Sequence, residues 1–213
     1  MPTENKSNKI ITIALAMIIT LAAITILYVS LPENKENKKP SGENHEQGGN
    51  QTGESAILTV IYGDEQTNYT LDELEALESY TGMGGYRTSF PSIKGQGNYT
   101  GVPVTTLVEL TAGNIENYSI VVTSNDGEKI ENKTYNYGFI MGNVDIYNPN
   151  NASDATPIGN GGLTMVLAYK YEGNYLNESK DGKIKIVFLD ENGSITSSGL
   201  WWKYVISIEI VEQ

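Results

Sequence analysis

The two residue types that most often bind transition metals or form reactive nucleophile–base pairs are almost absent from this 213-residue sequence. It contains no cysteine, a single histidine, His45, and a single arginine, Arg87. Without cysteine the chain cannot form a disulfide, an iron–sulfur cluster or a thiolate nucleophile, and with one histidine it cannot build a multi-histidine metal site. The formal net charge of −12 also opposes nucleic-acid binding, which needs a basic surface to neutralise phosphates.

Two glycine-rich segments and two acidic segments have the composition of ligand-binding loops. Residues 82–85 and 159–162 contain the glycines of a phosphate-binding loop but lack the Lys-Ser/Thr ending, so we interpret both as ordinary loops. Residues 190–192 and 143–154 offer the oxygen ligands that calcium prefers, but without the spacing of a calcium-binding loop. We therefore expect solvated turn carboxylates at both places.

Several aromatic residues could form a platform for a sugar or a peptide, although we favour simple packing as their role. If the last strand alternates, one of Trp201 and Trp202 faces the core and the other faces the outside or a cleft, because successive side chains of a strand point to opposite sides. The candidate platform residues are Tyr86, Tyr99, Tyr135, Tyr137, Trp201 and Trp202.

The longest apolar run lies near the amino terminus. Residues 10–31 contain no charge, proline or glycine, and as a helix they would span about 33 Å, enough to cross the hydrocarbon core of a bilayer. We predict a cytoplasmic tail at residues 1–9 and an uncleaved transmembrane helix at residues 10–31. A cleaved signal peptide is the alternative, but its apolar core is shorter, and Tyr28 is large where cleavage requires a small residue.

Residues 32–54 contain no aliphatic or aromatic side chain, so they cannot bury a core, and we predict a flexible linker with His45 as a solvated residue.

Lysines flank the apolar run almost equally and do not set its orientation. Glycosylation sequons after the run exceed the number expected by chance, which favours an extracytoplasmic domain, although a chain rich in Asn and Thr inflates their number. The candidate asparagines are Asn50, Asn68, Asn98, Asn117, Asn132, Asn151, Asn177 and Asn192.

Residues 55–213 have the length of one domain and predict an α+β fold with more strand than helix. Thr70 and Glu73 have the spacing of a capping box that opens a short helix through Leu77. Pro103 begins a second short helix, which Gly113 ends. Residues 141–162, rich in Asn, Asp, Pro and Gly, predict a long loop. Strands are predicted at residues 56–62, 118–124, 163–170, 184–189 and 202–211.

Five motifs follow one another in an order found in a known family. Residues 99–104 (YTGVPV), with Leu107 and Leu110, resemble a Trp-x-Gly-x-Pro-Leu helix entry, and residues 121–127 (VVTSNDG) resemble a strand that ends in Asp-Gly. Three later segments resemble a Leu-Ala-Tyr hairpin, a Gly-Pro-Leu-Arg-Leu-Val strand and a closing Trp-Val-Lys strand, at residues 167–176, 181–187 and 201–210. Together these motifs resemble the oxidoreductase molybdopterin-binding domain, the sulfite oxidase catalytic-domain family, and imply its mixed β-sheet with short helices.

The resemblance also implies molybdenum held by a cysteine thiolate, and a cofactor phosphate held by His, Arg and Lys. Counting back from Tyr99 places the metal-ligand position near Ser89, whose alkoxide would be a harder and more basic ligand than a thiolate. Lys185 stands in the place of the family's Arg, and Arg87 is the other weak candidate for cofactor binding. Beyond residue 31 acidic residues outnumber basic ones by about two to one, which repels a phosphate. We therefore expect no cofactor and no metal, and assign no catalytic residue.

Three functions remain open. The favoured interpretation is a cofactor-free binding or interaction domain in the cell membrane, with its N-terminus in the cytoplasm and its domain outside. Residues 10–31 would hold it in the membrane, and a surface protein or a small molecule would be its ligand. The alternatives are a molybdopterin-dependent oxidoreductase with unusual ligation through Ser89, and a surface structural protein associated with the coat. Metal content would separate the first two, and recovery of abundant surface proteins would indicate the third.

Overall fold

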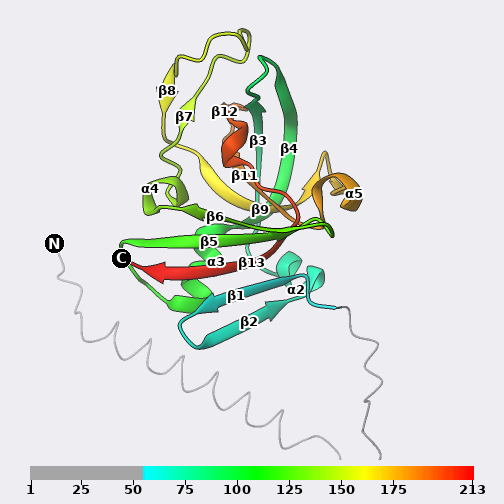
Figure 1. The fold of residues 1–213 in the computed structure, drawn as a ribbon, viewed down its shortest axis with the longest axis vertical. Coiled ribbons are helices and arrows are strands. Elements are labelled where there is room, and N and C mark those ends of the chain that lie inside the picture. Colours follow the sequence, from blue (N-terminus) through cyan, green and yellow to red (C-terminus); the bar gives the residue numbers. More distant parts are fainter. Residues whose placement is uncertain (1–54) are drawn as a thin grey trace, which may run out of the picture. The chain divides into compact units, whose positions relative to one another are not determined.

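The computed structural model describes residues 55–213 (Figure 1). The predicted tail, transmembrane helix and linker lie outside the described residues, as do His45 and the sequon at Asn50. Within residues 55–213, no helix has both the length and the apolar character needed to cross a membrane. The described part of the chain combines two main sheets with short helices, which confirms the predicted α+β class.

The first sheet has five strands in the order β2-β1-β13-β5-β6. The central strand β13 runs parallel to its neighbour β1, and the remaining pairs of neighbouring strands are antiparallel. The strands are β1 (Leu58–Tyr62), β2 (Glu65–Tyr69), β5 (Tyr118–Asn125), β6 (Ile130–Tyr135) and β13 (Val205–Glu212).

Only the inner face of this sheet is fully buried. Val60, Val122 and Ile208 have no exposed surface and belong to the core. Because side chains alternate along a strand, the intervening residues face the opposite side. There Thr59 pairs in register with Ser207, and both remain partly exposed. The alternation therefore gives the first sheet an outer face of mixed polar and aliphatic side chains.

The second sheet is built around the long hairpin of β3 and β4 and has the order β10-β9-β4-β3-β12, with β11 also paired to β9 (Figure 1). Every residue of β11 is buried, so this strand lies in the centre of the core. The strands are β3 (Tyr80–Arg87), β4 (Ile93–Pro103), β9 (Thr164–Tyr171), β10 (Asn174–Tyr175), β11 (Lys185–Leu189) and β12 (Ile195–Ser197).

Both predicted helices are confirmed. In the capping box of α2 (Leu71–Ala76), the Glu73 amide donates to Thr70 Oγ1 at 3.2 Å and the Thr70 amide donates to Glu73 Oε2 at 2.7 Å. Helix α3 (Val104–Ala112) has Pro103 and Gly113 as its two caps and contacts β1 of one sheet and β4 and β9 of the other. The smaller elements are α4 (Tyr137–Ile140), α5 (Glu178–Asp181) and a 3₁₀ turn, η1 (Ser198–Leu200).

The expectation of a loop at residues 82–85 was wrong, because these residues lie inside β3. A Cβ added at Gly84 would lie 2.6 Å from the Phe188 carbonyl oxygen, and one at Gly82 would lie 3.0 Å from the Asp190 carbonyl oxygen. The glycines thus allow β3 to approach the end of β11, where the amides of Met83 and Asp190 donate to each other's carbonyls.

Most predicted strands are confirmed with shifted ends. β1 begins at Leu58 rather than at residue 56, and β13 begins at Val205 rather than at residue 202. The β13 shift has a local cause, because Tyr204 adopts φ +53°, a left-handed conformation that a continuous strand cannot contain. Residues 141–162 are mostly irregular, as predicted, apart from the two-residue strands β7 (Asp145–Ile146) and β8 (Gly159–Asn160).

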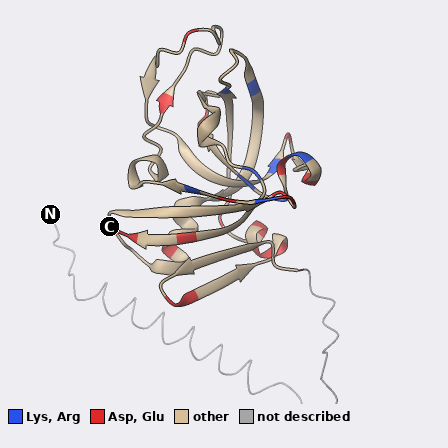
Figure 2. Cartoon of the chain, viewed as in Figure 1, with Lys and Arg blue, Asp and Glu red and all other residues tan. Residues whose placement is uncertain are grey.

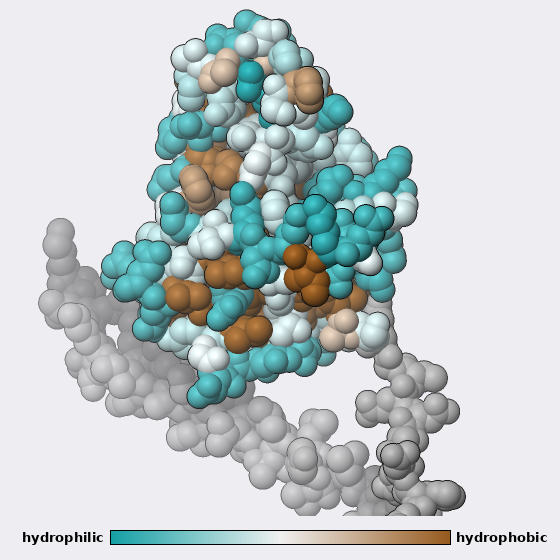
Figure 3. Space-filling view, viewed as in Figure 1, coloured by the Kyte–Doolittle hydropathy of each residue, from teal (hydrophilic) through white to brown (hydrophobic). Residues whose placement is uncertain are grey.

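The surface of the described residues is chemically mixed. Acidic residues mark the β1–β2 turn, α2 and β13, whereas lysines and carboxylates occur together around α5 (Figure 2). On the face shown in Figure 3, apolar side chains form small separate groups among hydrophilic ones.

Candidate functional site

The position predicted for a metal ligand lies on an exposed turn. Ser89 follows the end of β3 in the connection to β4, and its side chain is exposed. The adjacent Thr88 organises this turn by donating to the Phe90 carbonyl and by forming a 2.8 Å hydrogen bond with the Ser92 hydroxyl. Ser89 therefore belongs to the tip of a hairpin and not to an enclosed pocket.

Arg87 contacts the long loop after β7. Its Nε donates to the Ala152 carbonyl oxygen at 2.7 Å, and its guanidinium lies 5.8 Å from the centre of the Tyr147 ring. The single arginine thus fastens the β3 end to this loop. Asp126, the acidic residue of the Asp-Gly motif, follows β5 in the other sheet, so the two residues stand on different sheets.

Lys185 is a buried lysine with protein partners. Only 4% of its side chain is exposed, and its Nζ lies 2.9 Å from Asp181 Oδ1. The centres of the Tyr99 and Trp201 rings each lie 5.4 Å from the ammonium. Burial lowers the pKa of Lys185, and the Asp181 carboxylate offsets part of that effect. The charge of Lys185 is therefore enclosed and partnered by the protein itself.

The Asp181 carboxylate joins two lysines. Its Oδ1 lies 3.0 Å from Lys203 Nζ as well as near Lys185. Burial alone would raise the pKa of Asp181, but the two ammonium groups outweigh burial and hold the pKa below its usual value. This Lys-Asp-Lys cluster ties α5 to β11 and to the segment before β13.

The candidate platform residues do not form one surface. Tyr86 and Tyr99 pack against buried Trp201, at ring-centre distances of 5.0 and 5.3 Å. The Trp201 Nε1–H donates to Thr196 Oγ1 at 2.8 Å inside the protein. Tyr135 packs on Phe188, and Tyr137 packs on Tyr118 elsewhere in the core. These contacts favour the packing role.

Trp202 lines a small cavity together with Trp201. Both tryptophans precede β13, so the alternation expected for them as part of the last strand does not apply. The cavity has a volume of about 220 Å³ and is bordered by Asp126, Trp202 and Lys203. The Trp202 Nε1 atom is buried and has no hydrogen-bond partner among the described residues. Hydrogen bonds from the Lys129 and Glu128 amides to Asp126 lower the pKa of its carboxyl group, so this carboxylate organises its own turn.

These residues do not fit a molybdopterin cofactor. The chain has no cysteine, Ser89 is exposed, and the charges of Arg87 and Lys185 serve separate protein contacts. Within residues 55–213, no group of three or more His, Cys, Asp or Glu side chains is placed to hold a metal ion. The positions implied by the resemblance are therefore exposed or already bound to other protein groups.

The Asp190 carboxylate shapes a turn. Its Oδ1 accepts from the amides of Asn192, Gly193 and Ser194, and its Oδ2 accepts from the Ser194 hydroxyl at 2.6 Å. Burial would raise the pKa of Asp190, but these hydrogen bonds outweigh it and lower the pKa. This agrees with the interpretation of residues 190–192 as a turn, although Asp190 itself is half-buried rather than fully solvated.

The sequon asparagines that the structure describes are all exposed. They lie on strands, on turns and at the start of α5, so they are spread over several elements. The exposed set is Asn68, Asn98, Asn117, Asn132, Asn151, Asn177 and Asn192.

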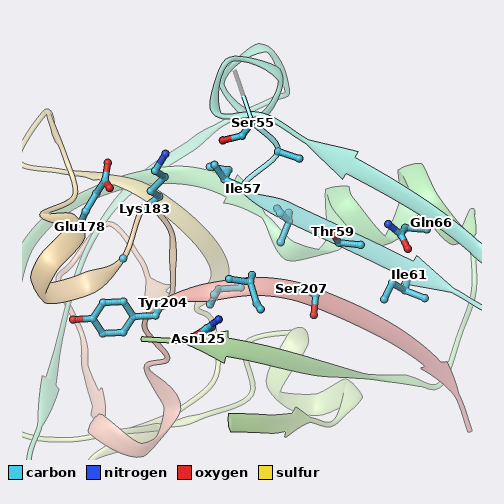
Figure 4. Close-up of a pocket in the computed structure, with 15 residues that line it drawn as sticks. Ser55, Ile57, Thr59, Ile61, Gln66, Asn125, Glu178, Lys183, Tyr204 and Ser207 are labelled. Carbon is cyan, nitrogen blue, oxygen red and sulfur yellow. The ribbon is translucent and has the colours of Figure 1, made fainter. Parts of the chain in front are cut away.

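A larger groove lies on the outer face of the first sheet. Its volume is about 700 Å³, and it runs from α5 along the starts of β1 and β13 (Figure 4). Glu178 and Lys183 stand at one end, and Gln66 and Ile61 stand at the other. We call this feature the outer groove. Its uncharged polar lining residues are Ser55, Thr59, Gln66, Asn125 and Ser207.

Tyr204 forms a side of the outer groove and fixes α5 beside it. Its hydroxyl donates to the Ser179 carbonyl oxygen at 2.9 Å, and its amide donates to the Asp181 carbonyl oxygen at 2.9 Å. Its carbonyl accepts from the Asn125 amide at 2.9 Å. A left-handed backbone is costly for a bulky residue, so these contacts must hold it in place.

No sequence motif marks the outer groove, so it could not be predicted from the sequence. Its lining comes from five separate segments: β1 with the residues before it, β2, the end of β5, α5 with the residues after it, and the start of β13 with the residue before it. A partial signal was present in β1 and β13, where Thr59 and Ser207 interrupt aliphatic runs at positions that face away from the core.

Comparison by sequence finds no matching protein family and no matching curated protein. Comparison of structures finds similarity to the sulfane dehydrogenase SoxCD from Paracoccus pantotrophus, with a TM-score of 0.50 and 13% sequence identity. The match covers 73% of this chain and 38% of the SoxCD chain. At this identity the similarity concerns the fold alone. The order of the motifs and the similarity of the structures together support a sulfite-oxidase-like fold for residues 55–213.

Proposed function

We propose that this chain is a membrane-anchored, extracytoplasmic binding domain of sulfite-oxidase-like fold that works without a molybdenum cofactor. The observation that carries the proposal is that the three residues expected to hold the cofactor are exposed or already bound to other protein groups. Ser89 lies on an exposed turn, Arg87 contacts Ala152, and Lys185 is buried against Asp181. An enzyme of this kind needs its metal ligand and phosphate contacts to converge on one cavity.

The outer groove supports a binding role. Its volume of about 700 Å³ lies within the range of small-molecule sites, about 300–1,000 Å³, and its lining mixes aliphatic and hydrogen-bonding side chains. No part of this role depends on a catalytic residue. Fold similarity to a dehydrogenase does not transfer its activity, because different functions are built on the same fold.

The decisive experiment measures molybdenum in the purified protein. We expect wild type and Ser89→Cys to purify without stoichiometric molybdenum from cells that make the cofactor abundantly. Ser89→Cys adds a thiolate, but it leaves the phosphate without basic partners, and an unpaired buried phosphate is costly. Elemental analysis of both proteins is the test. Near one molybdenum per wild-type chain would overturn the proposal, and uptake by Ser89→Cys alone would show that a cofactor pocket survives.

The described sequon asparagines are exposed, as glycosylation outside the cell would require. Protease added to intact cells or spheroplasts should digest the domain, because residues 10–31 are proposed to anchor it with residues 55–213 outside. Protection of the domain until the membrane is opened would show that the orientation is wrong. A known cytoplasmic protein in the same cells, protected throughout, serves as the control.

A further inference from the structure

We propose that the outer groove binds a neutral oligosaccharide. This inference rests on the proposed binding function and specifies its ligand. It follows from the charge of the groove, from its hydrogen-bonding groups and from the strand pairing beneath it.

The charges of the residues that line the groove favour an uncharged ligand. Among the described residues that line the groove, the charged ones are Glu178 and Lys183, one of each sign and both at the same end. The rest of the lining is neutral, although the whole chain carries a net charge of −12. A ligand with several anionic groups would meet no matching cations and would be repelled by the surrounding field. A polycationic ligand would find a single carboxylate.

The hydrogen-bonding groups match sugar hydroxyls. Thr59 and Ser207 place hydroxyls side by side on β1 and β13, and Gln66 adds an amide from β2. The Thr59 hydroxyl and the Gln66 amide nitrogen both donate to Asn68 Oδ1, at 2.9 and 3.1 Å, so their oxygens are the atoms left to accept from a ligand. Hydroxyl and amide side chains both donate and accept, as sugar hydroxyls do. Ile57 and Ile206 provide aliphatic surface beside them, which suits the carbon–hydrogen faces of a sugar ring.

Strand pairing disfavours an extended peptide as the occupant. Peptides that bind to a sheet usually add a strand to a free edge, where backbone groups are unpaired. From Thr59 onward β1 is paired with β2 on one side and with β13 on the other, and β13 is also paired with β5. The floor of the outer groove therefore offers side chains rather than a strand edge, which is the kind of contact that a sugar can use.

The position of Tyr204 is consistent with a prepared site. Its left-handed backbone and its three backbone-directed hydrogen bonds fix one side of the groove. Strained residues persist where the surrounding structure holds them, and they cluster at ligand sites. A rigid wall lowers the entropy that a ligand loses on binding.

The test uses the full chain, produced without glycosylation and kept in a detergent that has no sugar headgroup. The probes are neutral oligomers of glucose, galactose, mannose and N-acetylglucosamine, followed by calorimetry with the tightest binder. We expect saturable binding of at least one neutral oligomer. Thr59→Val and Ser207→Ala should each weaken it about tenfold, since each removes one hydroxyl from the groove. Ser207→Ala is the cleaner variant, because Thr59→Val also removes the hydrogen bond to Asn68.

Thr134→Val is the matched control. Thr134 is exposed on β6, and its register partner Val121 faces away from the core, but it does not line the groove. This variant should bind like wild type, and all variants should keep the wild-type circular dichroism and melting temperature. Absence of binding to every neutral oligomer, equal binding by Ser207→Ala, or preference for sulfated oligomers would each overturn the proposal. Molybdenum analysis of the same preparation separates failure of this inference from failure of the proposed function.

Discussion

The Lys185 ammonium is paired with Asp181 Oδ1 at 2.9 Å although the lysine side chain is only 4% exposed. A lysine in a fully buried strand would be strongly destabilising without this partner. The carboxylate comes from the end of α5, so the ion pair fixes a four-residue helix onto the core strand β11. The same helix borders the outer groove, which links core stability to the shape of the groove.

We expect Asp181→Asn to lower the free energy of unfolding by about 3 kcal/mol, because it leaves the buried ammonium without its counter-charge. Lys185→Met should cost less, since its apolar side chain can pack between the Tyr99 and Trp201 rings and removes the buried charge. Urea unfolding followed by circular dichroism measures both variants. Lys203→Met, at a lysine that is 42% exposed, is the control and should cost less than about 1 kcal/mol. A larger loss for Lys185→Met than for Asp181→Asn would contradict this account.

Acid should destabilise the domain through Asp181 and Asp190. Both carboxyl groups have folded-state pKa values below their usual 3.8, so the unfolded chain takes up protons first as the pH falls. Their stabilisation is fully present above pH 3.8 and is lost as the pH falls through the lower folded-state values. Unfolding free energies measured from pH 7 to pH 2 should therefore decline below about pH 4. Asp190→Asn should make this decline shallower. If the unfolding free energy of Asp190→Asn falls as steeply with pH as that of wild type, Asp190 does not contribute to the acid sensitivity.

The sequence predicted the elements that have strong local signals. The capping box at Thr70 and Glu73 and the Pro103–Gly113 helix depend on residues close to one another in the chain, and the structure contains both. The apolar run that follows Lys185 in β11 was also recognisable as a strand. The strands β2 and β6 were missed because they are edge strands with mostly polar, exposed side chains.

The candidate site could not be predicted in the same way. The glycines of β3 were interpreted as a loop because their role depends on the approach of β11, which comes about a hundred residues later. Lys185 was recognised as a candidate, but its burial and its pairing with Asp181 follow from the way α5 packs on β11. The outer groove depends on the pairing of β1 with β13, from opposite ends of the described chain. Non-local packing of this kind leaves little trace in short sequence patterns.

Gly101→Ala should strongly destabilise the second sheet. An added Cβ would lie 2.5 Å from the Ala168 Cα, in the backbone of the adjacent strand β9, so the two strands would have to move apart. Overpacking of this kind costs about 1–3 kcal/mol, and we expect the upper part of that range. Gly159→Ala is the control, because its nearest neighbour would be the Ile146 side chain at 4.0 Å. Equal melting temperatures for the two variants would show that β4 and β9 can separate without cost.

A chain that begins at Ser55 should fold with the same melting temperature and cooperativity as the full chain. The physical reason is the composition of residues 32–54, which contain no aliphatic or aromatic side chain and so cannot recover the entropy lost on ordering. Differential scanning calorimetry of the shortened and full chains, in the same detergent, measures the difference. Thr70→Ala serves as a reference variant for a small loss of stability. It removes the capping box of α2 and should lower the free energy of unfolding by about 1 kcal/mol. If loss of residues 1–54 lowers the melting temperature by more than Thr70→Ala does, those residues contact the domain, and their interpretation as a linker is wrong.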